Sequence, residues 1–169
     1  EAGFEPLAVP PNFNATQAKA SGAKGVFLSN GPGDPATLTA EIALVRELVG
    51  SFPVTGICLG HQLIGHALGG TTDKLKFGHR GGNQPVRDMK TGRVYITSQN
   101  HGYAVVSESL DKSVAQLSYV NINDNTCEGL DYPSLHAYSM QFHPEAHSGP
   151  RDMRFSFQRF MDLMDGGEL

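Results

Sequence analysis

The sequence has few cysteines, no long apolar run and no excess of basic residues. Its 169 residues include only two cysteines, Cys58 and Cys127, which are too few for a disulfide framework. The formal net charge is −4, which argues against a nucleic-acid-binding protein. No apolar run approaches the roughly 20 residues that span a bilayer. We therefore expect one soluble globular domain from a reducing compartment, and we assign it to the cytoplasm.

The first half of the chain alternates short apolar runs with helical patterns. Strands are predicted at residues 5–9, 25–29 and 54–58, and helices at residues 40–49 and 60–68. Such alternation predicts an α/β fold in which helices cover both faces of a mostly parallel sheet.

The second half predicts a short antiparallel strand region and a final helix. The strand candidates are residues 93–97, 103–106, 114–120, 127–130 and 137–142, with tight turns at residues 91–92 and 123–125. The final helix begins after a cap at Ser148 or Gly149 and ends at residues 166–167. Its apolar face is interpreted as core packing and comprises Met153, Phe157, Phe160, Met161 and Met164.

The strongest chemical signal is the cysteine in Gly56-Ile57-Cys58-Leu59-Gly60, where a predicted strand runs directly into a helix. A nucleophile elbow has this pattern, because its sharp turn leaves no room for neighbouring side chains. The helix N-terminus favours negative charge on the sulfur, and the Leu59 amide can bind an oxyanion. The alternative is a buried structural cysteine, and that interpretation stands for Cys127, which has no such context.

A nucleophilic cysteine requires a base, and His143 has the best setting among seven histidines. It ends a predicted strand, and Glu145 follows two residues later, where its carboxylate could orient the imidazole. A metal pair of His143 and His147 is the alternative, but Pro144 disfavours a helix that presents both. The spacing of His61 and His66, five residues apart, also disfavours a metal site.

Five separated segments together resemble the triad-type glutamine amidotransferase (glutaminase) family. They are LSNGPGDP (28–35), GICLGHQ (56–62), FGHRGGNQPV (77–86), SQNHGYAV (98–105) and MQFHPE (140–145). Within that family they are most similar to the small, glutamine-hydrolysing subunits of carbamoyl phosphate synthetases. The resemblance implies a three-layer, flavodoxin-like glutaminase fold.

The resemblance also implies roles for individual residues. Cys58 is the nucleophile, His143 the base and acid, and Glu145 the orienting carboxylate, while the amides of Gly31 and Leu59 form the oxyanion hole. The implied substrate-binding residues are Gly33, Gln62, Asn100, Gly102 and Tyr103. For Gln62 a helix-surface amide remains an alternative, and for Asn100 a turn residue.

The implied reaction is hydrolysis of glutamine to glutamate and ammonia through a γ-glutamyl thioester. The ammonia would pass to a synthetase large subunit for carbamoyl phosphate synthesis in the pyrimidine and arginine pathways. No metal or other cofactor is expected in this domain, because ATP, bicarbonate and metal would act on the partner. Neither nucleic acid nor membrane is an expected partner.

The resemblance further implies that residues 1–169 form a glutaminase domain without the family's first strand and helix and without its separate N-terminal domain. Two other functions stay open: a different cysteine hydrolase on the same fold, and a catalytically silent module that docks a synthetase.

Overall fold

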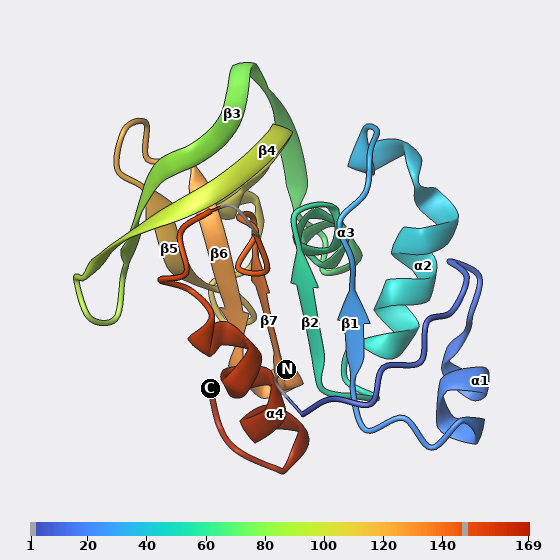
Figure 1. Cartoon of the computed structure of the whole chain (residues 1–169). Coiled ribbons are helices and arrows are strands. Elements are labelled where there is room, and N and C mark those ends of the chain that lie inside the picture. Colours follow the sequence, from blue (N-terminus) through green and yellow to red (C-terminus); the bar gives the residue numbers. More distant parts are fainter. Residues whose placement is uncertain (1–2, 147–148) are drawn as a thin grey trace.

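A seven-stranded mixed sheet forms the centre of the molecule in a computed structural model that describes residues 3–146 and 149–169 (Figure 1). The strands are β1 (Val26–Leu28), β2 (Val54–Ile57), β3 (Thr71–Asp88), β4 (Val94–Val106), β5 (Gln116–Asn121), β6 (Cys127–Tyr132) and β7 (Ala137–Met140). The helices are α1 (Ala15–Ala20), α2 (Thr39–Leu48), α3 (Leu59–Ala67) and α4 (Phe155–Met164). None of these described helices is long and apolar enough to cross a membrane.

The sheet combines a parallel part with a larger antiparallel part. Its strand order is β1-β2-β7-β6-β5-β3-β4. The pairs β1–β2 and β2–β7 are parallel, and the other four pairs are antiparallel. The antiparallel part is more extensive than expected, because short turns connect β3 to β4 and β5 to β6. The predicted α/β class is confirmed.

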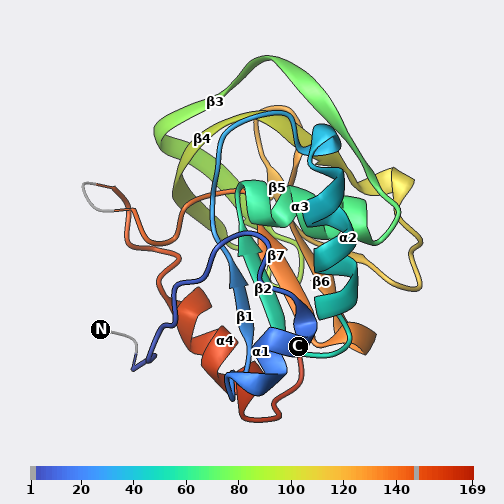
Figure 2. The ribbon, with the colours of Figure 1, turned by 90° about the vertical axis from the view of Figure 1, so that its right-hand side faces the viewer.

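Helices cover both faces of the sheet, as predicted (Figure 2). On one face, α2 and α3 pack against side chains such as Val54, and Ile64 is fully buried there. On the other face, α4 packs Phe160 into a second core that contains Ile57 and Tyr138. Because side chains of β2 and β7 alternate between the two cores, these two strands are buried on both sides.

The N-terminal segment differs from the prediction. Residues 5–9 form no strand, and Leu7 is 66% exposed. Prolines at positions 6, 10 and 11 lack the N–H groups that a paired strand needs. Helix α1 was not predicted, although Asn14 and Gln17 form a reciprocal capping box with two bonds of 2.9 Å.

The long strand β3 was not predicted either, and the predicted strands 93–97 and 103–106 are parts of the single strand β4. Glycines and charged residues in β3 hide a strand pattern, and two register shifts interrupt its pairing with β4. The β3–β4 pair arches over the end of the sheet where β1 and β2 terminate (Figure 1). It thereby brings β4 above the strand ends that carry the predicted site.

The remaining predicted strands and helices occur within a few residues of their expected positions. Of the predicted apolar face, Met153 precedes α4 and is buried, as is Phe160 within the helix, whereas Phe157, Met161 and Met164 are half-buried. The cap at Gly149 is wrong, because α4 begins only at Phe155, and Ser148 lies outside the described residues.

Candidate active site

Cys58 occupies a strained turn between β2 and α3, as the elbow pattern predicts. Its backbone has φ 50° and ψ −105°, a region that L-residues rarely adopt. A Cβ on Gly56 would lie 2.6 Å from the carbonyl carbon of Gly60. A Cβ on Gly60 would lie 2.3 Å from the carbonyl oxygen of Leu28. Both flanking positions therefore require glycine, because β1, β2 and α3 meet there backbone to backbone.

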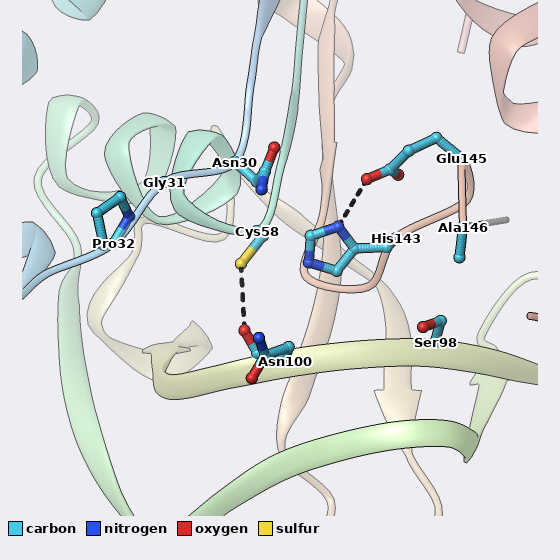
Figure 3. Close-up of a pocket in the computed structure, with 9 residues that line it drawn as sticks. All are labelled: Asn30, Gly31, Pro32, Cys58, Ser98, Asn100, His143, Glu145 and Ala146. Carbon is cyan, nitrogen blue, oxygen red and sulfur yellow. Dashed lines mark hydrogen bonds and ion pairs between the residues drawn. The ribbon is translucent and has the colours of Figure 1, made fainter. Parts of the chain in front are cut away.

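The predicted triad residues gather around one cavity of about 600 Å³ (Figure 3). Its lining comprises Asn30, Gly31, Pro32, Cys58, Ser98, Asn100, His143, Glu145 and Ala146. A ring nitrogen of His143 faces the Cys58 sulfur across the cavity (Figure 3). Residues that are 85 positions apart in sequence are thus presented to the same space.

His143 is held both by its ring and by its main chain. Its Nδ1 lies 2.7 Å from Glu145 Oε1, and its main-chain N–H donates to the Ser98 carbonyl at 2.8 Å. Contact with the Cys58 thiol, followed by the hydrogen bond to Glu145, raises the pKa of His143 to about 10. The site therefore favours an imidazolium at neutral pH, which is suited to pair with a thiolate and to donate a proton.

The loop after β1 lies directly against the start of α3. A Cβ on Gly31 would lie only 2.6 Å from Leu59 Cδ2, so the Leu59 side chain would have to move to make room for it. Gly33 has φ 102°, a conformation that favours glycine. Gly31 lines the cavity, whereas Leu59 and Gly33 do not. The oxyanion hole formed by the Gly31 and Leu59 amides stays a prediction.

The other four predicted substrate-binding residues lie on α3 and β4. Gln62 is buried, so it is not a helix-surface amide, and its Nε2 donates to the Tyr103 carbonyl at 2.8 Å. Asn100 lies within β4 and not in a turn, and its carbonyl oxygen is 3.9 Å from the Cys58 sulfur. Of this set, only Asn100 lines the cavity, whereas Gln62, Gly102 and Tyr103 do not.

The other buried histidines are poor bases. His61 has no exposed surface, and burial, with a further effect of His101, lowers its pKa to about 3. Burial is also the largest cause that lowers the pKa of His101 to about 4. His147 and the metal pair that it would form with His143 lie outside the described residues. Cys127 is buried, and burial raises its pKa to about 12, as expected for a structural thiol.

One group of side chains was missed by the sequence analysis. His79, His101 and Glu128 bring possible metal-ligating atoms within 4.8 Å of one another, in the part of the chain that the structure describes. They come from β3, β4 and β6, so no local sequence spacing could have indicated this group. Both ring nitrogens of His79 are already bonded to carboxylates, which describes a hydrogen-bonded network more closely than a metal centre.

A family model and curated relatives agree on the family that this chain resembles. The family model "Glutamine amidotransferase class-I" matches residues 1–163. The chain is 63% identical over 164 residues to a carbamoyl phosphate synthase small chain of Desulfovibrio desulfuricans, covering 97% of this chain and 43% of the relative. It is 48% identical to the chloroplastic small chain of Oryza sativa, covering 99% and 37% respectively. The chain thus spans less than half the length of these relatives.

Solved structures support the fold. A putative GMP synthase subunit from Thermoplasma acidophilum superposes with a TM-score of 0.79 at 21% identity, covering 94% of this chain and 80% of that one. The glutaminase domain of Trypanosoma brucei CTPS, solved with bound acivicin, gives a TM-score of 0.64 at 19% identity, covering 96% and 81%. At such identities the likeness concerns the fold alone.

Proposed function

This chain belongs to the class-I glutamine amidotransferase family, and from that premise we propose that it hydrolyses glutamine to glutamate and ammonia. The observation that carries the proposal is the elbow cysteine, which faces a histidine that is itself bound by a carboxylate. The relatives named carbamoyl phosphate synthase small chain support a finer proposal, that the ammonia serves carbamoyl phosphate synthesis.

In the first half of the reaction, the Cys58 thiolate attacks the side-chain carbonyl carbon of glutamine. The carbonyl oxygen becomes an oxyanion, and the amides of Gly31 and Leu59 are the proposed donors to it. The His143 imidazolium gives its proton to the amide nitrogen, so that ammonia leaves and a γ-glutamyl thioester remains. Glu145 holds the imidazole by its Nδ1 and stabilises its positive charge.

In the second half, neutral His143 takes a proton from water, which attacks the thioester carbonyl. The carbon–sulfur bond breaks, glutamate is released, and the Cys58 thiolate and His143 imidazolium are restored. One imidazole therefore gives the proton to the leaving ammonia and takes the proton from the attacking water, and the γ-carboxylic acid of the released glutamate loses its proton to solvent. The site needs no metal or other cofactor for either step. Asn100 lines the cavity and is the proposed contact for the α-amino and α-carboxylate groups of glutamine. Gly33, Gln62, Gly102 and Tyr103 are the other proposed substrate-binding residues.

The proposed partner is a synthetase large subunit, which would use the ammonia with ATP, bicarbonate and metal. Transfer to a partner would prevent loss of ammonia as ammonium at neutral pH. We also propose a reducing location such as the cytoplasm, since Cys58 and Cys127 are both free thiols.

The decisive experiment compares glutamate release by the chain with release by Cys58→Ala and by the control Cys127→Ala. We expect Cys58→Ala to abolish hydrolysis and Cys127→Ala to retain it. A glutamine analogue that alkylates thiols should label Cys58 and protect it from a second reagent. Hydrolysis by Cys58→Ala, or selective labelling of Cys127, would overturn the proposal. Faster release from γ-glutamyl peptides than from glutamine would instead favour a different hydrolase.

A further inference from the structure

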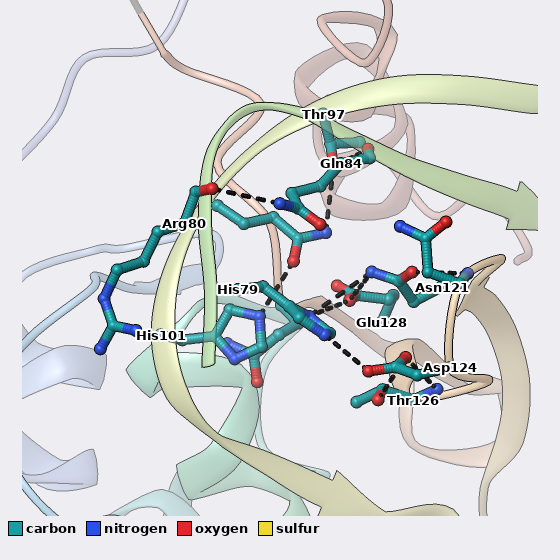
Figure 4. A network of polar contacts seen from close by, with 12 residues as sticks. His79, Arg80, Gln84, Thr97, His101, Asn121, Asp124, Thr126 and Glu128 are labelled. Atoms are coloured by element: carbon teal, nitrogen blue, oxygen red, sulfur yellow. Dashed lines mark hydrogen bonds and ion pairs between the residues drawn. The ribbon is translucent and has the colours of Figure 1, made fainter. Parts of the chain in front are cut away.

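Beside the cavity, a network of polar side chains joins β3, β4 and β6, with His79 at its centre (Figure 4). His79 Nδ1 lies 3.1 Å from Glu128 Oε1, and its Nε2 lies 2.8 Å from Asp124 Oδ2. Glu128 has no exposed surface, and its Oε1 also accepts from Asn121 Nδ2 at 3.1 Å. The hydrogen bond to Glu128 is the largest cause that raises the pKa of His79 to about 9, so the ring is cationic at neutral pH.

The network reaches the cavity through β4. His79 and His101 are register partners, and their rings meet edge to face, with centroids 4.9 Å apart and planes at 88°. His101 Nδ1 lies 2.8 Å from the Tyr103 carbonyl oxygen, to which it donates. Its neighbour Asn100 lines the cavity and places its carbonyl oxygen 3.9 Å from the Cys58 sulfur. A displacement of His101 would therefore move the cavity wall.

The backbones of β3 and β4 are also in direct contact at this point. Gly78, next to His79, has φ 68°, and a Cβ there would lie 2.4 Å from the His101 carbonyl oxygen. On the far side, Gln62 Nε2 donates to the Tyr103 carbonyl from α3. Residues 99–103 are thus held between the histidine network and the helix that carries the elbow.

We propose that His79 is a positioning residue that fixes residues 99–103 of β4 against Cys58 by neutralising Glu128 and supporting the His101 ring. The inference rests on the proposed glutamine hydrolysis. Among the described residues, none donates a hydrogen bond to Glu128 Oε2, so this buried carboxylate depends strongly on His79 for its charge balance. Without the cation, a buried unpaired charge remains, and the network must rearrange to reach water or to protonate.

The kinetic test compares His79→Gln, the double variant His79→Gln/Glu128→Gln and the exposed control His136→Gln. Because His79 touches none of the triad, His79→Gln should raise KM for glutamine about tenfold while kcat changes by less than about threefold. The double variant should recover most of the KM, since it removes the carboxylate that required a cation. His136→Gln should behave as the unchanged chain does.

A second measurement does not depend on turnover. Amide hydrogen exchange of residues 99–103 should be faster in His79→Gln than in the unchanged chain and slow again in the double variant. Unchanged exchange, or unchanged KM in an active His79→Gln enzyme, would refute the inference. A metal chelator that reproduced the His79→Gln changes would identify a metal site and refute it too. If the unchanged chain failed to hydrolyse glutamine, the proposed function would fail, and exchange would still decide this inference.

Discussion

The close packing at the elbow predicts that Gly60, the first glycine after Cys58, cannot be replaced without loss of stability and activity. In Gly60→Ala, the new Cβ would lie 2.3 Å from the Leu28 carbonyl oxygen. Close carbon–oxygen contacts in proteins are about 3.3 Å, so α3 and β1 must separate by about 1 Å. The obstacle is the main chain of β1, which is held by its pairing with β2 and cannot turn aside as a side chain can.

Two losses should follow from that displacement. A misplacement of about 1 Å at a reacting group can cost about 10²-fold, so we expect kcat/KM for glutamine to fall by that order. Overpacking typically costs about 1–3 kcal/mol, and we expect a comparable fall in the free energy of unfolding. The fall should occur although alanine favours a helix over glycine by about 1 kcal/mol.

The matched control is Gly65→Ala, in the same helix. The atoms nearest to its Cβ would be the two methyl groups of Val105, at 3.1 and 3.2 Å, which can move slightly. We expect its unfolding free energy to change by less than about 1 kcal/mol, with kcat/KM nearly unchanged. Glutamate release and urea denaturation measure both quantities. A Gly60→Ala enzyme as stable and as active as Gly65→Ala would refute the reasoning from close backbone packing.

Three further changes test other parts of the structure. Glu145→Gln removes the negative charge 2.7 Å from His143 Nδ1, so kcat should fall about 10²-fold. Because Glu145 helps to raise the pKa of His143, the alkaline limb of the pH–rate profile should also move to lower pH, and an unmoved limb would contradict this. The pKa of His79 is raised to about 9, so its stabilisation is complete below its ordinary pKa of about 6.5 and is lost as pH rises through 9. Denaturation across that window should show a decline of about 1–3 kcal/mol, and a flat profile would argue against the ion pair. Arg159→Gln removes the 2.6 Å ion pair with Asp131 and the cation 4.4 Å from the Tyr138 ring centroid. Thermal melts should show a loss of about 1–3 kcal/mol in the free energy of unfolding. The value of kcat should be unchanged, and lost activity would contradict this.

The sharp turn at Cys58 and the residues proposed as a triad could be singled out from the sequence because their signals are local. Gly56, Cys58 and Gly60 mark a turn that only this order of small residues permits, and His143 and Glu145 are two positions apart. The parallel strands were likewise evident as continuous apolar runs. A strand that is buried on both faces has little freedom in composition, so its sequence alone reveals it.

Predictions from the sequence were wrong where pairing with other parts of the chain decides the conformation. Residues 5–9 are apolar enough for a strand, but the prolines within and after them leave too few donors for a ladder. The strand β3 has a weak pattern of its own, and β4 supplies the hydrogen bonds that keep it extended through two register shifts.

The sequence by itself determined the α/β class of the fold, and it singled out Cys58, His143 and Glu145 as the proposed nucleophile, base and orienting carboxylate. Only the tertiary structure decided that Gln62 is buried and does not line the cavity, that Asn100 does line it, and that His79 and Glu128 form an ion pair. The physical reason is distance along the chain. Turns and capping depend on neighbouring residues, whereas a buried ion pair between β3 and β6 exists only after the sheet has brought the two strands together.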